Sequence, residues 1–125
     1  MKQEIKNIHR GEIWTGDLGE PFESEQGDTR PLLIIQNDTG NHYSDTTIVI
    51  PITSSLKKTN MPVHVSISEN FLLKDSQALC EQGRVISKSR LSHKLGKISK
   101  ENQDLIDIAL MISQGLEKYL PINAK

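Results

Sequence analysis

The chain has 125 residues, of which 35% are hydrophobic and 25% are charged, and its formal net charge is −1. We expect one globular domain over residues 1–125, with a core at about residues 8–117 and a short flexible C-terminal tail. The near-zero charge excludes a surface coated with positive charge for indiscriminate nucleic-acid binding. Cys80 is the single cysteine and cannot form an internal disulfide, so the chain does not require an oxidising compartment.

The sequence carries no signal for a membrane, a metal or a cofactor. Residues 1–12 hold no apolar run of signal-peptide length, and no stretch approaches the ~20 residues that span a membrane. We therefore expect a cytoplasmic protein without a membrane partner. The histidines lie far apart and no glycine-rich phosphate-binding motif is present, so we expect no metal and no cofactor.

Short apolar runs in the first half of the chain predict β-strands. Glu12–Leu18 is expected to open the sheet. Pro31–Ile35 is a continuous branched run, typical of a strand buried on both faces, and the turn formers at 37–41 predict a turn after it. The next strand, Thr46–Thr53, contains Pro51, which indicates an edge position or a bulge.

The second half of the chain predicts further short strands. Residues 63–68 alternate between apolar and polar, as in a half-buried strand, so His64 is expected to face solvent. Strands are also expected over Gln77–Ile86, where Cys80 fills apolar space, and over Lys94–Ile98. Short strands separated by turns predict a small β-barrel or a strongly curved sheet.

The hydrophobic period changes near the C-terminus and predicts a helix packed on that sheet. Ser99 can cap its start, and Glu101 lies in the first turn, where the helix dipole favours negative charge. The apolar stripe expected to face the core comprises Leu105, Ile108, Ala109, Ile112 and Leu116.

A long loop at 19–30 ends in Arg30-Pro31, where the chain enters the buried strand. Loops of this length are often functional, and an arginine anchored by a sheet presents a rigid fork of donors to a phosphate or carboxylate. The alternative is a surface ion pair between Arg30 and Glu25 or Asp28.

Several segments, in order along nearly the whole chain, share a common resemblance. They are RGEIW at 10–14, SEQ at 24–26 followed by Arg30-Pro31, IIQNDTGN at 34–41, PIT at 51–53, Glu81-Gln82 with Arg84, and ALMISQGL at 109–116. In these segments the sequence resembles the MazF/PemK toxin family. One departure is Glu23, which stands where many relatives have glycine.

The resemblance implies a mainly β fold with a C-terminal helix, an SH3-like β-barrel of the CcdB/PemK toxin type, working as a homodimer. It implies the toxin of a type II toxin–antitoxin system, held silent by a MazE-type antitoxin. The implied activity is sequence-specific, metal-independent cleavage of single-stranded RNA through attack by the 2′-hydroxyl. The products are 2′,3′-cyclic phosphate and 5′-hydroxyl ends.

By the same resemblance, Arg30 and Thr53 carry the reaction. The arginine fork suits the charge that builds on the phosphate, and the threonine hydroxyl can donate a hydrogen bond to it. Glu25 either orients Arg30 or accepts the proton of the 2′-hydroxyl, and a nearby arginine makes a carboxylate a weaker base.

Base recognition requires stacking surfaces and hydrogen-bonding groups around the phosphate. Phe22 is either a stacking platform or a plug that holds its loop down. A cluster of basic residues either extends the RNA-binding groove or lies outside it. It comprises Lys88, Arg90, His93, Lys94 and Lys97. The remaining candidates for RNA binding are Ser24, Gln26, Ser54, Lys57, Glu81 and Gln82.

Two other functions remain open from the sequence. One is a CcdB-like toxin that binds gyrase on a similar barrel and performs no chemistry. The other is a catalytically inactive relative that binds RNA or antitoxin without cutting.

Overall fold

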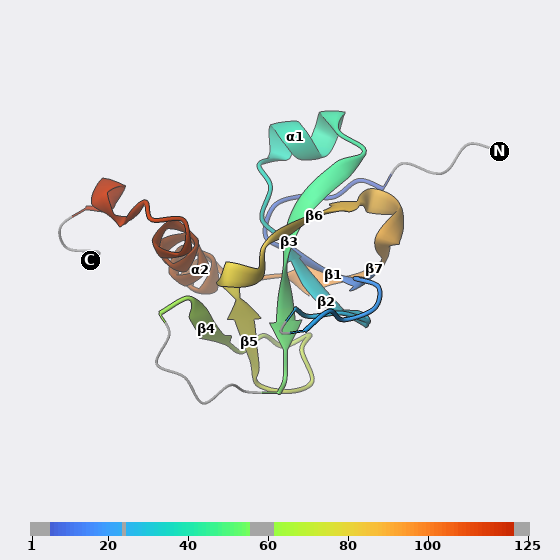
Figure 1. Ribbon diagram of the computed structural model, residues 1–125, viewed down its shortest axis with the longest axis horizontal. Helices are drawn as coiled ribbons and strands as arrows, with labels where there is room; N and C mark the ends of the chain where they lie inside the picture. The colour runs from blue at the N-terminus through green and yellow to red at the C-terminus, as the bar shows by residue number, and fades with distance from the viewer. Residues whose placement is uncertain (1–5, 24, 56–61, 122–125) are drawn as a thin grey trace.

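The computed structural model describes residues 6–23, 25–55 and 62–121 as a curved antiparallel sheet with one long helix (Figure 1). The strands are β1 (Glu12–Asp17), β2 (Thr29–Ile34), β3 (Thr46–Thr53), β4 (His64–Ile67), β5 (Ser76–Leu79), β6 (Arg84–Ser87) and β7 (Leu91–Lys97). The helices are α1 (Asp38–Tyr43) and α2 (Lys100–Ser113), and short 3₁₀ turns lie at Cys80–Gln82, Lys88–Arg90 and Glu117–Tyr119.

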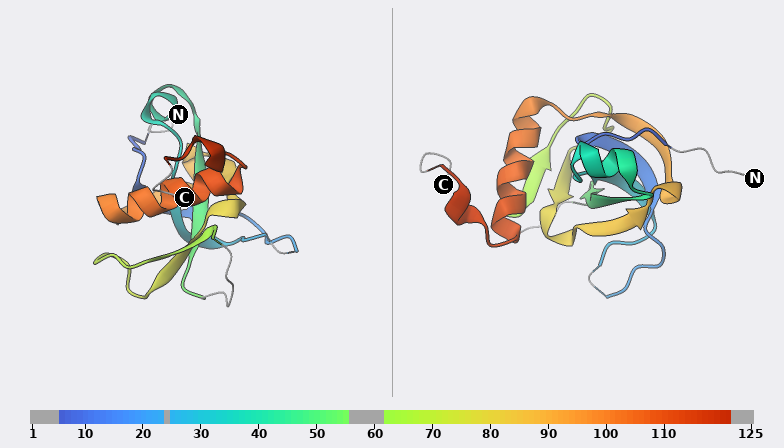
Figure 2. Two further views of the ribbon diagram at one scale, coloured as in Figure 1. Left: turned by 90° about the vertical axis from the view of Figure 1, so that its left-hand side faces the viewer. Right: turned by 90° about the horizontal axis from the view of Figure 1, so that it is seen from above.

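The strands follow the order β4-β5-β3-β2-β1-β7, and β6 pairs with the first half of β3. All pairings are antiparallel, and the sheet curls around its own axis (Figure 2). Within the described residues the two end strands, β4 and β7, do not pair. The strongly curved sheet therefore does not close into a barrel. The predicted mainly β fold with a C-terminal helix is confirmed.

Strand β2 is buried on both faces, as its sequence predicts. Successive side chains of a strand point to opposite faces, so Leu33 joins one apolar cluster while Leu32 and Ile34 join another. The first cluster lies under α2, which contributes Ile106 and Ala109 to it. Because both of its faces are packed, β2 is a rigid base for the loop that precedes it.

Pro51 does not mark an edge, because β3 lies inside the sheet. One side of β3 pairs with β2 over Val49–Pro51. The other side pairs first with β6, over Thr46–Val49, and then with β5, from Ile52. Pro51 falls at the change of partner. The sheet tolerates a residue without a backbone N–H there, since the ladder is already interrupted.

The turn predicted at 37–41 is a short helix, α1. Asn37 caps it by accepting a hydrogen bond from the backbone N–H of Gly40 at 2.8 Å. The buried Asn41 side chain holds the helix to the sheet: its Oδ1 accepts from the hydroxyl of Thr47 at 2.7 Å. The local sequence contains the right turn-forming residues, but these tertiary bonds extend the turn into a helix.

Three further expectations need correction. His64 does not face solvent, since its side chain is 7% exposed. The strand predicted over Gln77–Ile86 is broken by the 3₁₀ turn that holds the buried Cys80. Ser99 caps α2 as predicted, but the apolar stripe is only partly core: Leu105 on α2 is 52% exposed, and Leu116, which lies beyond the end of α2, is 41% exposed.

Candidate functional site

Arg30 and Thr53 lie together at one end of the β2–β3 pair, at the end of β3 opposite α1 (Figure 1). The strands pair Leu32 with Pro51, and the same register continued by two residues sets Arg30 against Thr53. Both residues line one pocket of 590 Å³, together with Ser54 and Ser55. The sheet therefore joins two residues that lie far apart in sequence.

The guanidinium of Arg30 is anchored at one nitrogen. Its Nε donates a hydrogen bond to the carbonyl oxygen of Gly27 at 2.8 Å. No other side-chain hydrogen bond or ion pair joins Arg30 to any residue in the described ranges 6–23, 25–55 and 62–121, so the alternative pairing with Glu25 or Asp28 is not formed. Both terminal nitrogens are thus available to a ligand.

The carbonyl that anchors Arg30 belongs to a loop closed at its base. The backbone N–H of Asp28 donates to the oxygen of Gly19 at 2.5 Å, and that of Leu18 donates to the oxygen of Asp28 at 3.0 Å. Gly27 packs so closely that a Cβ there would lie 2.4 Å from the nitrogen of Pro21. This packing fixes the position of the Gly27 carbonyl and, through it, of Arg30.

Thr53 is buried at the end of β3 but presents its hydroxyl to the pocket. Only 6% of the residue is exposed, and Oγ1 accepts a hydrogen bond from the backbone N–H of Ser55 at 3.1 Å. Accepting this bond orients the hydroxyl and leaves its hydrogen free to donate. Thr53 can therefore donate to an anion beside Arg30.

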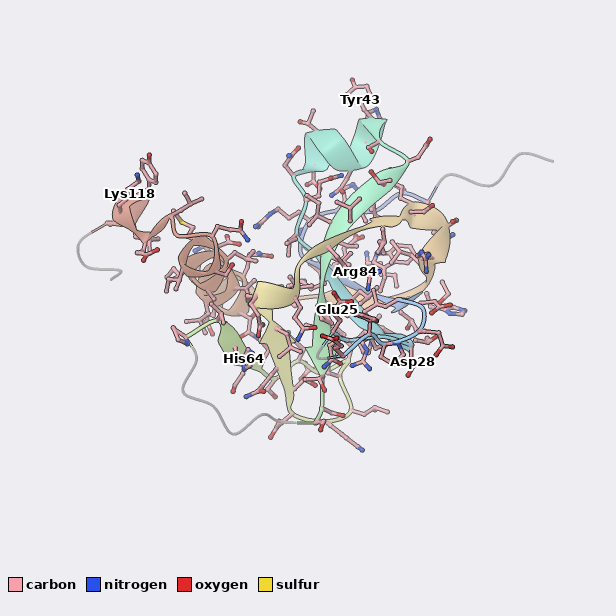
Figure 3. The ribbon with its side chains drawn as sticks, viewed as in Figure 1. Glu25, Asp28, Tyr43, His64, Arg84 and Lys118 are labelled. Atoms are coloured by element: carbon pink, nitrogen blue, oxygen red, sulfur yellow. The ribbon has the colours of Figure 1, made fainter. Side chains whose placement is uncertain are left out.

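A second pocket of 490 Å³ is lined by polar residues, and three of them, Gln26, Glu81 and Gln82, are among those predicted to bind RNA. Glu25, Gln26, Glu81, Gln82 and Arg84 all line it. The backbone N–H of Gln26 donates to Oε1 of Gln82 at 2.9 Å, so the first loop is tied to the 3₁₀ turn. Figure 3 shows Glu25 and Arg84 on the same side of the molecule.

Both pockets include residues of β3 in their linings. Pro51 lines the second pocket, and the next two residues, Ile52 and Thr53, line the first. Glu25 lies in the second pocket and makes no ion pair with Arg30, in the described part of the chain. The structure thus has one pocket lined by Arg30 and Thr53 and another lined by polar residues of the first loop and the 3₁₀ turn.

His64 contacts Glu81, a residue that lines the second pocket, and the sequence did not indicate this contact. Its Nε2 lies 2.5 Å from Oε2 of Glu81, and its Nδ1 is buried without a hydrogen-bond partner among the described atoms. The alternation correctly places His64 on the polar face of β4, but on that face its side chain is covered by its contact with Glu81 of the 3₁₀ turn instead of facing solvent.

The remaining predicted residues lie apart from the pockets or outside the description. Phe22 is 66% exposed, so it is not a plug, and it lines neither pocket. Ser24 and Lys57 lie outside the described residues. The basic cluster is not one surface, because Lys88 is buried and donates to the carbonyl of Asn41, and Lys94 pairs with Glu12 at 2.9 Å.

The described residues were also compared with the requirements of a metal site, a membrane span and a cysteine nucleophile. They contain no cluster of three or more His, Cys, Asp or Glu able to hold a metal, and no helix among them is long and apolar enough to cross a membrane. Burial, with the nearby carboxylates of Glu81 and Asp107, raises the pKa of Cys80 to about 12. Its thiol therefore stays protonated and is no nucleophile at neutral pH.

Comparison with known proteins identifies the family. Residues 9–113 match the family described as PemK-like, MazF-like toxin of type II toxin–antitoxin system. The chain belongs to this family. A MazF-like relative named Endoribonuclease MazF, from Staphylococcus epidermidis, is 46% identical over 114 residues, which cover 90% of this chain and 95% of the relative.

Solved MazF structures share the fold at lower identity. A MazF from Deinococcus radiodurans superposes with a TM-score of 0.77 at 19% identity, covering 88% of this chain and 98% of that one. An endoribonuclease from a mycobacterial species, solved with its cognate antitoxin, gives a TM-score of 0.74 at 21% identity and covers 87% of this chain and 96% of that one. At these identities the likeness shows the MazF fold.

Proposed function

We propose that this MazF-family chain is a sequence-specific endoribonuclease that cleaves single-stranded RNA without a metal. The observation that carries the proposal is the free guanidinium fork of Arg30 beside the Thr53 hydroxyl in one pocket. The 46% identical relative named as an endoribonuclease supports it. The reaction is attack of the RNA 2′-hydroxyl on its own phosphate, which leaves a 2′,3′-cyclic phosphate and a 5′-hydroxyl.

Arg30 stabilises the negative charge that develops on the phosphate during this attack. Its Nε is held by Gly27, so the two terminal nitrogens can each donate to one non-bridging oxygen. A guanidinium stays protonated at neutral pH, so we assign Arg30 charge stabilisation and not the role of the base. A donor fixed before the substrate arrives avoids the reorganisation that water would require.

Thr53 adds a second donor to the same phosphate. Because its Oγ1 is already oriented by the N–H of Ser55, the hydroxyl hydrogen is directed without loss of rotamer freedom on binding. Ser54 lines the same pocket, is exposed, and is placed to contact the RNA backbone.

Glu25 is the candidate acceptor for the 2′-hydroxyl proton. Glu25 lines the second pocket. Among the described residues, it forms no hydrogen bond or ion pair with Arg30 through which it could orient the guanidinium. The same pocket supplies Gln26, Glu81, Gln82 and Arg84, whose donors and acceptors suit the edges of a splayed base. Phe22, Ser24 and Lys57 complete the set proposed to bind RNA.

The proposal extends to the partners and location of the chain. As a type II toxin it is expected to be inhibited by a MazE-type antitoxin, to work as a homodimer and to reside in the cytoplasm. The mycobacterial relative solved with its cognate antitoxin supports the first of these. Copurification with an antitoxin encoded beside it, and loss of RNA cleavage in that complex, would test it.

The activity is tested by incubating the chain with a long single-stranded RNA in EDTA and mapping the product ends. We expect discrete cuts that leave 2′,3′-cyclic phosphates. Arg30→Ala and the isosteric Thr53→Val should lose activity, whereas Tyr43→Ala, on the exposed face of α1 far from the pockets (Figure 3), should keep it.

Three outcomes would contradict the proposal. Cutting only in the presence of a divalent metal would exclude the metal-free reaction. Stabilised DNA cleavage complexes with gyrase and no RNA cutting would favour a CcdB-like toxin. Tight RNA or antitoxin binding without any cutting would indicate an inactive relative.

A further inference from the structure

We propose that Phe71, held against Gly96, is a stacking platform for the base of a nucleotide next to the phosphate bound at Arg30. The inference rests on the proposed function, since it names a subsite of the same pocket. It is carried by two observations on residues outside the family-like segments: apolar side chains line the same pocket as Arg30, and the Phe71 ring lies against Gly96.

The pocket of Arg30 and Thr53 is lined by apolar as well as polar residues. Phe71, Leu72 and Leu73, from the segment between β4 and β5, line it together with Leu95 of β7. Leu73 is 100% exposed and Leu95 is 36% exposed. A nucleotide has the same division, because its phosphate is anionic and its base is a flat ring with apolar faces.

Gly96 holds the Phe71 ring in place. A Cβ built on Gly96 would lie 2.5 Å from Cδ2, 2.7 Å from Cε2 and 2.7 Å from Cγ of Phe71. Three ring atoms this close mean that the ring lies against the glycine, in space that any side chain would fill. The ring is therefore fixed before RNA binds, which reduces the entropy lost on stacking.

Phe71 also differs from the other aromatic candidate. Among the described residues that line the two pockets, Phe71 is the only aromatic one. Phe22 is 66% exposed on its loop and lines neither. Bases of single-stranded RNA stack on aromatic side chains whatever their sequence, so Phe71 would add affinity beside the phosphate while the second pocket reads a base edge.

A purely structural role for Phe71 predicts different behaviour. The residue is half-buried and packs against the core cluster under α2, so its loss could act through the fold. Phe71→Leu keeps apolar volume but removes the π-face, and Phe71→Tyr keeps the ring. Gly96→Ala should displace the Phe71 ring, although Gly96 itself does not line the pocket.

The test is the affinity of an uncleavable RNA for these variants. The probe is a short RNA spanning a mapped cut, with 2′-deoxyribose at the scissile nucleotide. A second set carries one abasic nucleotide at each position around the cut. Dissociation constants are measured by fluorescence anisotropy for the native chain, Phe71→Leu, Phe71→Tyr and Gly96→Ala, with Tyr43→Ala as the control and unfolding free energies measured beside them.

We expect Phe71→Leu and Gly96→Ala to weaken binding of the intact probe roughly 5- to 50-fold, and Phe71→Tyr and Tyr43→Ala to bind like the native chain. The abasic probe that lacks the stacked base should bind the native chain and Phe71→Leu with equal affinity. The position missing in that probe identifies the base that stacks on Phe71. Unchanged affinity in Phe71→Leu, or the same loss with every abasic probe, would overturn the inference.

Failure of the subsite and failure of the proposed function are distinguishable. If the native chain cuts RNA in EDTA but the Phe71 variants bind normally, only the subsite is wrong. If the native chain binds the long RNA of the mapping experiment without cutting it, the function is wrong. The subsite then stands only if Phe71→Leu, and not Phe71→Tyr, loses affinity for that long RNA. Absence of any RNA binding would overturn both.

Discussion

Two arginines near the two ends of β2 differ in how many of their donor groups are bonded within the chain. The difference distinguishes an arginine that stabilises the fold from one that is available to a ligand. Arg10 lies at the end next to α1 and is bonded at three donor groups, its backbone N–H, Nε and Nη2. Its backbone N–H donates to Asp38 at 2.7 Å, its Nε donates to the carbonyl of Ile35 at 3.0 Å, and its Nη2 contacts Asp107 at 2.7 Å. Arg30, at the other end, has one side-chain bond, through Nε.

The other polar residues follow the same division. At the α1 end, buried Glu12 accepts hydrogen bonds from the His9 backbone at 2.9 Å and from Trp14 Nε1 at 3.0 Å, and it pairs with Lys94. At the pocket end, Thr53 retains a free hydroxyl hydrogen. Fully paired polar groups stabilise the fold, whereas pre-oriented groups that keep unused donors are available to bind a ligand.

Replacing Arg30 gives the largest expected effect. Arg30→Ala should lower the single-turnover cleavage rate about 10²- to 10³-fold, as expected when a preorganised charge-stabilising donor is lost. Arg30→Lys should recover only part of the rate, because a single ammonium cannot donate in two fixed directions. Urea unfolding of both variants should stay close to native. A large loss of stability would contradict the division drawn between the two ends.

Gly27→Ala tests whether the loop positions Arg30. The new Cβ would lie 2.4 Å from the Pro21 nitrogen, so the loop and its carbonyl must shift. We expect the cleavage rate to fall by up to about 100-fold, since a displacement of about 1 Å at a catalytic group has effects of this size. The control is Tyr43→Ala, at a residue that is exposed on α1 and lines neither pocket. Native activity in Gly27→Ala would mean that Arg30 does not depend on this loop.

Arg10→Ala should show the reverse pattern. It removes the side-chain bonds to Ile35 and Asp107, both partly exposed, so we expect a loss of about 1–3 kcal/mol of unfolding free energy. At temperatures where the variant stays folded, its single-turnover rate should equal the native rate. A reduced rate without lower stability would place Arg10 in the catalytic machinery and break the comparison.

Acid should weaken the α1 end. Burial disfavours the charged form of Glu12, but the hydrogen bonds from Trp14, Lys94 and the His9 backbone outweigh it and lower its pKa below 4.5. The backbone N–H of Arg10 likewise lowers the pKa of Asp38 below 3.8. Stability from these groups is complete above their ordinary pKa values and is lost as the pH falls through the folded ones.

Glu12→Gln should therefore flatten the pH dependence of unfolding below 4.5 and cost roughly 1–2 kcal/mol at pH 7. Denaturant unfolding between pH 7 and 3 measures both. Equal slopes below pH 4.5 for the variant and the native chain would show that Glu12 does not supply this dependence.

The smallest effect is expected at Glu23. Its φ is 53°, in the left-handed region that favours glycine. Glu23→Gly relieves this strain but adds freedom to the unfolded chain, so we expect a stabilisation of at most about 1 kcal/mol. Thermal melting measures it. A lower melting temperature would mean that unfolded-state entropy dominates at this position.

Much of the fold is predictable from local patterns because apolar runs and periods determine which elements form. The strands over Glu12–Asp17 and Thr46–Thr53 and the Ser99 cap of α2 follow in this way. The patterns fail where distant contacts decide: bonds to buried Asn41 make α1 a helix, and the 3₁₀ turn at Cys80–Gln82 covers His64.

The site shows the same limit. Arg30 and Thr53 are predictable because they lie in family-like segments at the ends of strong strands. Phe71 and Gly96 belong to no such segment, and only the packing of the segment after β4 against β7 brings them together. An aromatic residue and a glycine that lie 25 positions apart carry no joint signal in one sequence.

The central claim is that Arg30 binds the reacting phosphate directly. It is tested by replacing one non-bridging oxygen of the scissile phosphate with sulfur and measuring single-turnover cleavage in EDTA by the native chain and by Arg30→Ala. We predict that one sulfur diastereomer slows the native chain about tenfold or more, and that this effect shrinks towards unity in Arg30→Ala, because the lost contact is the same in both. Equal sulfur effects in the two proteins would show that Arg30 does not contact the phosphate, and would contradict the account.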